Sequence, residues 1–185
     1  TLRLTDYGLA LIVEAVQRHR RARDRHEALV EQVAREMQRA GRVVWRGLSL
    51  RAPLPVPAAE GTGTSWAMAM PDVFSIRHTT VEDYVEPVVH EIKVRRADLL
   101  SDLRQPAKRA AYLALSSQCW YVLQDGIGAP GEVPPECGVL IARAGGLELA
   151  RPAPQRPMRL AFGTWMALAR ATAEPPLDDE AQGRL

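Results

Sequence analysis

The sequence is poor in lysine. Two of its 24 basic residues are lysine, Lys93 and Lys108, and the rest are arginine. Where only charge is needed, this sequence uses arginine, so each lysine indicates a position that requires a compact ammonium group. Cysteine is equally scarce: Cys119 and Cys137 are too few for a disulfide framework or a zinc site, and we expect a cytoplasmic protein. No apolar run reaches about 18 residues, so we expect no membrane-spanning helix.

The 185 residues are enough for one domain with a real core. We expect a single domain over 1–173, with N-terminal helices in 1–41, an α/β core in 42–151, a last helix in 158–173 and a flexible tail over 174–185. The net charge of +2 does not by itself indicate a nucleic-acid partner. Five arginines fall within 18–25, however, and they form either a solvated helix end or a patch that contacts phosphates.

Hydrophobic periodicity predicts the order of the elements. It indicates helices over 7–19 and 24–40, the second ended by Gly41, and a strand over 42–50. A Pro- and Gly-rich loop over 52–65 precedes strands over 66–77 and 84–94. Helical segments in 96–116 are interrupted by Pro106, and strands over 119–124, 139–143 and 147–151 precede the last helix. This order predicts an α/β fold with a mixed β-sheet flanked by α-helices.

Asp72, Glu91 and Lys93 are the candidate functional residues. Glu91 and Lys93 are two apart, so on a strand they project from the same face, while Ile92 points the other way. If the strand holding Asp72 pairs beside this one, two carboxylates and the Ile92 backbone carbonyl form an oxygen-only site suited to Mg²⁺ or Mn²⁺. Lys93 would then orient an attacking water and offset charge on a phosphate. The competing interpretation is a surface ion pair between Glu91 and Lys93.

Two aromatic side chains near this motif have less specific interpretations. By alternation, His90 points to the face opposite Glu91, which favours a packing role over a ligand role. Trp66 borders the Pro- and Gly-rich loop and could stack on a nucleic-acid base, although packing is the more conservative expectation.

The motif Pro71-Asp72, followed by Glu91-Ile92-Lys93, resembles the PD-(D/E)XK nuclease superfamily, which has the restriction-endonuclease-like fold. The similarity continues through Lys108, Tyr112 and the segment around 119–140, and it covers about half of the chain. It is similar there to a bacterial and phage group of such proteins, some of them linked to DNA repair. The resemblance implies a Mg²⁺- or Mn²⁺-dependent nuclease that hydrolyses phosphodiester bonds of DNA, or of RNA as the less favoured substrate.

The resemblance also implies the site residues. Asp72 and Glu91 would be metal ligands and Lys93 would be catalytic. Family members often add an acid from a preceding helix, for which Glu31 is the candidate and Glu27 and Glu36 are rivals. They often add a polar residue from the helix after the motif; Asp98, Gln105 and Lys108 are available, and we choose Lys108 because it is the other lysine. The competing interpretation of Lys108 is an ordinary exposed helix residue. Asp98 and Asp102 either share a solvated helix face or cap the start of the helix.

Two other functions fit the same sequence. One is a catalytically inactive nucleic-acid-binding or assembly module that keeps the fold, and the other is a structural protein with a surface ion pair. Many nucleases dimerise to cut both strands, and the sequence leaves a homodimer open.

Overall fold

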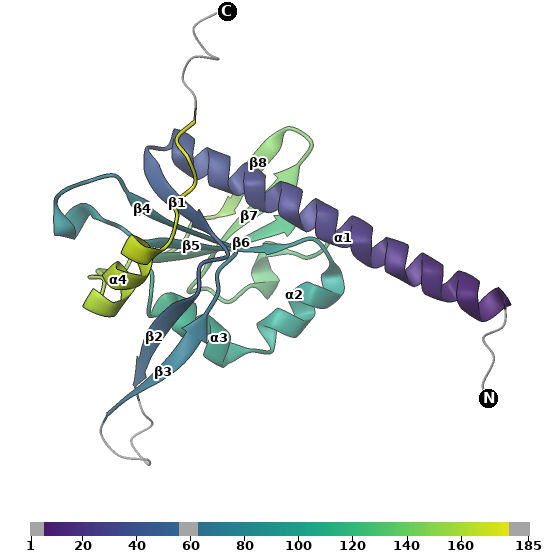
Figure 1. Cartoon of the computed structure of the whole chain (residues 1–185), viewed down its shortest axis with the longest axis horizontal. Coiled ribbons are helices and arrows are strands. Elements are labelled where there is room, and N and C mark those ends of the chain that lie inside the picture. The colour runs from purple at the N-terminus through teal and green to yellow at the C-terminus, as the bar shows by residue number, and fades with distance from the viewer. Residues whose placement is uncertain (1–5, 56–62, 178–185) are drawn as a thin grey trace, which may run out of the picture.

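The computed structural model describes residues 6–55 and 63–177. One long helix, α1 (Asp6–Arg39), opens the fold, and its N-terminal part projects beyond the rest of the molecule (Figure 1). The prediction of two helices over 7–19 and 24–40 is therefore wrong at the join. The arginine-rich segment between them contains no glycine or proline, and arginine is a good helix former. The helix ends at Arg39, within one residue of the predicted end, and the chain turns at Gly41, whose φ of +74° suits a residue without a Cβ.

A mixed six-stranded sheet forms the centre, in the order β1-β4-β5-β6-β7-β8. Strands β1 (Arg42–Arg46), β4 (Val73–Arg77) and β5 (Val88–Lys93) are antiparallel. Strands β6 (Gln118–Gln124) and β7 (Gly138–Arg143) then run parallel to β5, and β8 (Gly146–Arg151) is antiparallel to β7. The predicted α/β fold with a mixed sheet flanked by helices is confirmed.

Different elements cover the two faces of the sheet. Helix α1 packs on one face, where Leu29, Val30 and Val33 meet Ile92. The other face carries α2 (Arg96–Leu103), α3 (Pro106–Leu113), α4 (Phe162–Arg170) and a two-stranded sheet of β2 (Leu50–Pro55) and β3 (Thr64–Ala69). Figure 1 shows α1 and these elements on opposite sides of the sheet. Strand β5 lies between both layers, which is why all six of its residues are buried.

The region before β4 differs from prediction. Residues 52–55 and 64–65 of the predicted loop over 52–65 belong to the strands of a hairpin, because Pro53 and Pro55 are tolerated in a two-stranded sheet whose strands are both at an edge. Residues 56–62 lie outside the described chain. The predicted strand over 66–77 is interrupted at residues 70–72, which include Pro71. Asp72 therefore lies between β3 and β4.

The C-terminal predictions are partly wrong. The last helix spans 162–170, not 158–173. Glu174, placed by the sequence in a flexible tail, donates its backbone N–H to the Val44 carbonyl at 2.7 Å and pairs with Arg46 at 2.7 Å. Residues 178–185 of that tail lie outside the described chain. Within the described part, none of the helices has the length and apolar character needed to cross a membrane.

Candidate active site

Glu91 and Lys93 project from the same face of β5, as their spacing predicts. Both are buried, with 3% and 8% of their surface exposed, and the Lys93 ammonium donates a hydrogen bond to Glu91 Oε1. This burial rules out the competing interpretation of a solvated surface pair. His90 is buried in its turn (2% exposed) but lies on the α1 face with Ile92, and burial lowers the pKa of its imidazole to about 3. His90 is therefore a neutral packing residue.

Lys108 and Asp102 complete a group of four charges around Glu91, here called the ion cluster (Glu91, Lys93, Asp102, Lys108). Lys108 Nζ lies 2.6 Å from Glu91 Oε1 and 2.5 Å from Asp102 Oδ1, and Lys93 Nζ lies 3.4 Å from the same Asp102 oxygen. The two lysines of the sequence thus meet at one point, from β5 and from α3. Two ammonium groups balance two carboxylates, which is how charge is tolerated in a buried place.

Two tyrosines enclose the ion cluster. Tyr112 Oη lies 2.9 Å from Glu91 Oε2 and 3.0 Å from the Met70 carbonyl oxygen, and Tyr121 Oη donates to Asp102 Oδ2 at 2.6 Å. Burial, reinforced by the neighbouring carboxylates, raises the pKa of both phenols far above their ordinary value. Both hydroxyls therefore stay protonated and act as fixed hydrogen-bond donors.

Contacts within the ion cluster keep Asp102 and Lys108, its two members on helices, ionised. Burial alone would raise the pKa of Asp102, but Lys93, Lys108 and the Tyr121 hydroxyl together lower it. Burial would likewise lower the pKa of Lys108, but Glu91 and Asp102 outweigh it and the pKa rises. Asp102 and Lys108 consequently carry opposite charges at neutral pH.

Asp72 lies at the edge where β4 begins, beside β5. Its Oδ2 accepts a hydrogen bond from the Ile92 backbone N–H at 2.7 Å, and its Oδ1 lies 3.4 Å from His26 Nε2 on α1. The contact with Asp72 raises the pKa of His26 despite partial burial. Asp72 opens into a depression of about 440 Å³. The lining residues of this depression are His26, Glu27, Val30, Arg46, Gly47, Asp72 and Glu174.

Asp72 and the backbone of Ile92 meet at one edge of β5, and Glu91 is the preceding residue of that strand. Val73 pairs with His90, and the same register extended by one residue sets Asp72 opposite Glu91. In a strand the N–H and C=O of a residue leave on the same edge, so the Ile92 carbonyl points to the edge where its N–H meets Asp72. Over 6–55 and 63–177 no group of three His, Cys, Asp or Glu side chains is placed to hold a metal. A metal here would need the backbone carbonyl.

The α1 acid predicted for this site is elsewhere. Glu31 forms an ion pair with Arg35 at 2.5 Å on the helix surface, and Glu36 pairs with Arg39 at 2.7 Å. Glu27 lines the Asp72 depression, and the α1 side chain that contacts Asp72 is His26. The geometry thus favours His26 and Glu27 over Glu31.

Sequence reasoning missed several members of the site. Asp102 was read as part of a solvated helix face but is 5% exposed. Tyr112 follows Lys108 by four residues, so a shared helix face was a usable signal. Tyr121 lies opposite Glu91 in the parallel β5–β6 register, which only the structure reveals. For His26, the sequence carried no signal that distinguishes it from its neighbours on α1.

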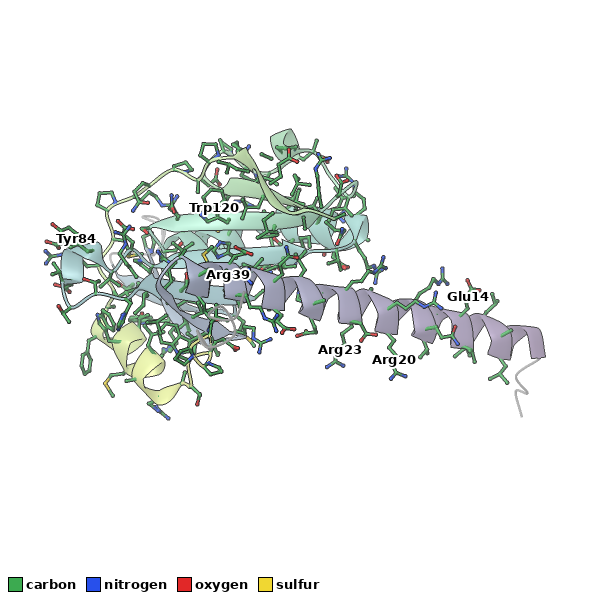
Figure 2. All side chains as sticks on the ribbon, turned by 90° about the horizontal axis from the view of Figure 1, so that it is seen from above. Glu14, Arg20, Arg23, Arg39, Tyr84 and Trp120 are labelled. Carbon is green, nitrogen blue, oxygen red and sulfur yellow. The ribbon has the colours of Figure 1, made fainter. Side chains whose placement is uncertain are left out.

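A basic groove runs along residues 15–25 of α1. It has a volume of about 840 Å³ and is lined by Ala15, Arg18, His19, Arg21, Ala22, Asp24, Arg25 and Arg95. The arginine-rich segment is therefore the middle of a helix and not a helix end. Arg20 and Arg23 extend from one side of the projecting helix and Glu14 from the other (Figure 2).

Comparisons with known proteins give no family. No protein-family model and no curated protein matches the chain. A solved structure of a protein of unknown function from Silicibacter pomeroyi is similar over 75% of this chain and 77% of that chain, with 24% identity and a TM-score of 0.48.

Proposed function

We propose that this chain is a metal-dependent nuclease that hydrolyses phosphodiester bonds of DNA, with RNA as the less favoured substrate. The observation that carries the proposal is the convergence of Lys93 and Lys108 on Glu91, the residue that faces Asp72 when the β4–β5 register is extended by one residue. A buried cluster of this kind costs desolvation energy, and a hydrophobic core would be as stable without it. Strongly interacting ionisable groups of this kind favour a functional role over a purely structural one.

The donor set suits Mg²⁺ or Mn²⁺. Asp72 and Glu91 carboxylates and the Ile92 carbonyl are hard oxygen ligands, which both ions prefer. Glu91 Oε2 accepts a hydrogen bond from the Tyr112 hydroxyl. A carboxylate oxygen can accept more than one partner, so Glu91 Oε2 could also bind a cation. When bound, the ion would polarise a phosphate oxygen and lower the pKa of a water.

The side chains would divide the remaining work. Lys93, held by Glu91 and Asp102, would orient the attacking water and offset the negative charge that grows on the phosphate. Lys108 has 31% of its side chain exposed and would contact the phosphate from the solvent side. Tyr112 fixes the Glu91 carboxylate, and Tyr121 fixes Asp102. The arginines of the α1 groove would hold flanking phosphates.

A cleavage assay tests the proposal. Supercoiled plasmid and circular single-stranded DNA are incubated with the chain in Mg²⁺ or Mn²⁺, and Lys93→Ala should cleave at least about 100-fold more slowly, as when a fixed charge-stabilising donor is lost. Arg143→Ala is the control, because Arg143 forms an ion pair with Glu148 on the exposed β7–β8 hairpin. An RNA transcript is incubated in the same way; the proposal fails if the parent cleaves neither DNA nor RNA, or if Lys93→Ala cleaves as fast as Arg143→Ala.

The second candidate is a nucleic-acid-binding module without catalysis. One observation favours it: both ammonium groups are bound to the same oxygen, Glu91 Oε1, which leaves the acid neutralised from within the protein. A chain that does not cleave, yet binds DNA with an affinity that falls steeply with salt, would decide for this alternative.

A further inference from the structure

One face of the β2–β3 hairpin exposes a row of large apolar side chains. Trp66, Met68 and Met70 are 55%, 62% and 61% exposed, and they are two residues apart, so they project from the same side; we call them the apolar stripe. Ala69, on the opposite side, is buried in the core with α3 and α4. The expectation that Trp66 packs inside the protein is therefore wrong. Isolated exposed apolar residues need no explanation, but a contiguous row of three marks a binding surface.

The apolar stripe leads to the candidate active site. The Met70 carbonyl oxygen lies 3.0 Å from Tyr112 Oη, which also contacts Glu91, and Asp72 follows Met70 by two residues. Same-face side chains recur about every 6.7 Å along a strand, so Trp66 lies within about 20 Å of Asp72 along the chain. A ligand on the stripe is therefore guided to the edge of β5.

One basic side chain, that of Arg51, lies beside the stripe. Arg51 lies opposite Met68 in the β2–β3 register, and its guanidinium is 5.2 Å above the centroid of the Trp66 ring. Strands β2 and β3 contain no Asp or Glu. An aromatic and thioether surface beside a fixed guanidinium matches a ligand that has both flat rings and phosphates.

We propose that the apolar stripe binds the unpaired bases of single-stranded DNA and delivers that strand to Asp72 and Glu91. Trp66 stacks on a base, Met68 and Met70 contact the next bases, and Arg51 contacts the backbone. A duplex hides the faces of its bases in its own stack, so it cannot use this surface. The delivery step rests on the proposed nuclease function, whereas the binding step does not.

The test measures binding without cleavage. A fluorescein-labelled single-stranded oligothymidylate and a duplex of equal length are titrated in EDTA, with fluorescence anisotropy as the readout. Trp66→Ala should weaken single-strand binding about tenfold, since one base stack on an aromatic side chain contributes about 1–3 kcal/mol. Trp66→Phe keeps a ring and should stay within about twofold of the parent. Phe162→Ala is the matched control, because Phe162 is an exposed aromatic residue (77%) on α4 that does not belong to the stripe.

Four outcomes overturn the assignment of the stripe to single-stranded DNA. It fails if the parent does not bind the single strand, if Trp66→Ala binds it like Phe162→Ala, or if Trp66→Ala weakens duplex binding equally. It also fails if sedimentation reveals a dimer that Trp66→Ala dissolves, because a second copy of the chain then occupies the stripe. If single-strand binding behaves as expected but no nucleic acid is cleaved in Mg²⁺ or Mn²⁺, the nuclease proposal fails and the stripe assignment stands.

Discussion

Replacing Lys93 by Met tests whether the ion cluster is a coupled unit. Methionine keeps most of the apolar stem of Lys93 but removes its charge, which leaves two carboxylates with one ammonium, that of Lys108. The Lys93 and Glu91 side chains are only 10% and 4% exposed, so water cannot replace the lost partner. Removing one member of a buried pair costs about 3–5 kcal/mol, and because Lys108 still contacts both acids we expect the lower end, about 3 kcal/mol.

The double variant Lys93→Met/Glu91→Gln supplies the decisive comparison. It restores charge balance, with Asp102 facing Lys108, so its loss of stability should be smaller than the sum of the two single losses by about 2 kcal/mol. The Lys93→Met deficit should also shrink as pH falls. Asp102, with its pKa lowered, contributes stability above its unfolded pKa near 3.8 that is lost as pH drops, and Lys93 is part of the cause of that lowering.

Urea unfolding at several pH values measures these quantities. Arg143→Met is the control, because the Arg143–Glu148 pair is more than half exposed on both sides and should contribute less than about 1 kcal/mol. A Lys93→Met loss as small as that of the control, or a double variant whose loss equals the sum of the singles, would refute the idea of a coupled cluster.

Three further predictions follow from other contacts. The Asp72 contact raises the pKa of His26, so it stabilises the fold below pH 6.5, and this stabilisation is lost as pH rises through the raised pKa. In urea unfolding, His26→Gln should therefore lower the free energy of unfolding more at pH 6 than at pH 9. His90 titrates near pH 3 when folded and near 6.5 when unfolded, so the parent loses stability between those values, and His90→Leu should unfold at a lower pH in an acid titration followed by circular dichroism. Gly138→Ala would put a Cβ against the Trp120 ring and 2.7 Å from the Ala153 backbone nitrogen, and should cost about 1–3 kcal/mol in thermal unfolding.

The sheet was predictable because its signals are local. The apolar run of β5, Pro106 at the start of α3 and the Gly145-Gly146 pair where the chain turns into β8 each specify structure over a few residues. The hairpin was not predictable in the same way, because Pro53 and Pro55 argue against a strand until the partner β3 is known. The continuous α1 was missed because a run of arginines was read as a helix end, although it contains no helix breaker.

The candidate site was likewise predictable where its contacts lie within one element and not where they join distant elements. The shared face of Glu91 and Lys93 depends on alternation along one strand and could be read directly. Asp102 and Tyr121 reach the cluster through α2 packing on the sheet and through the β5–β6 register, which connect residues far apart in sequence. The choice of Glu31 failed to select the α1 side chain beside Asp72, because the rotation of a helix about its axis is fixed by its packing, and here the packing of Val30 and Val33 brings His26 to Asp72.

A calorimetric titration of Mn²⁺ tests most directly whether the edge of β5 is a metal site. We expect the parent to bind a single ion and Asp72→Asn to bind it at least about tenfold more weakly, whereas Asp98→Asn, which removes an exposed carboxylate of α2, should bind like the parent. A parent that binds no Mn²⁺, or an Asp72→Asn variant that binds it as tightly as Asp98→Asn, would contradict the assignment of Asp72, Glu91 and Ile92 as the metal ligands.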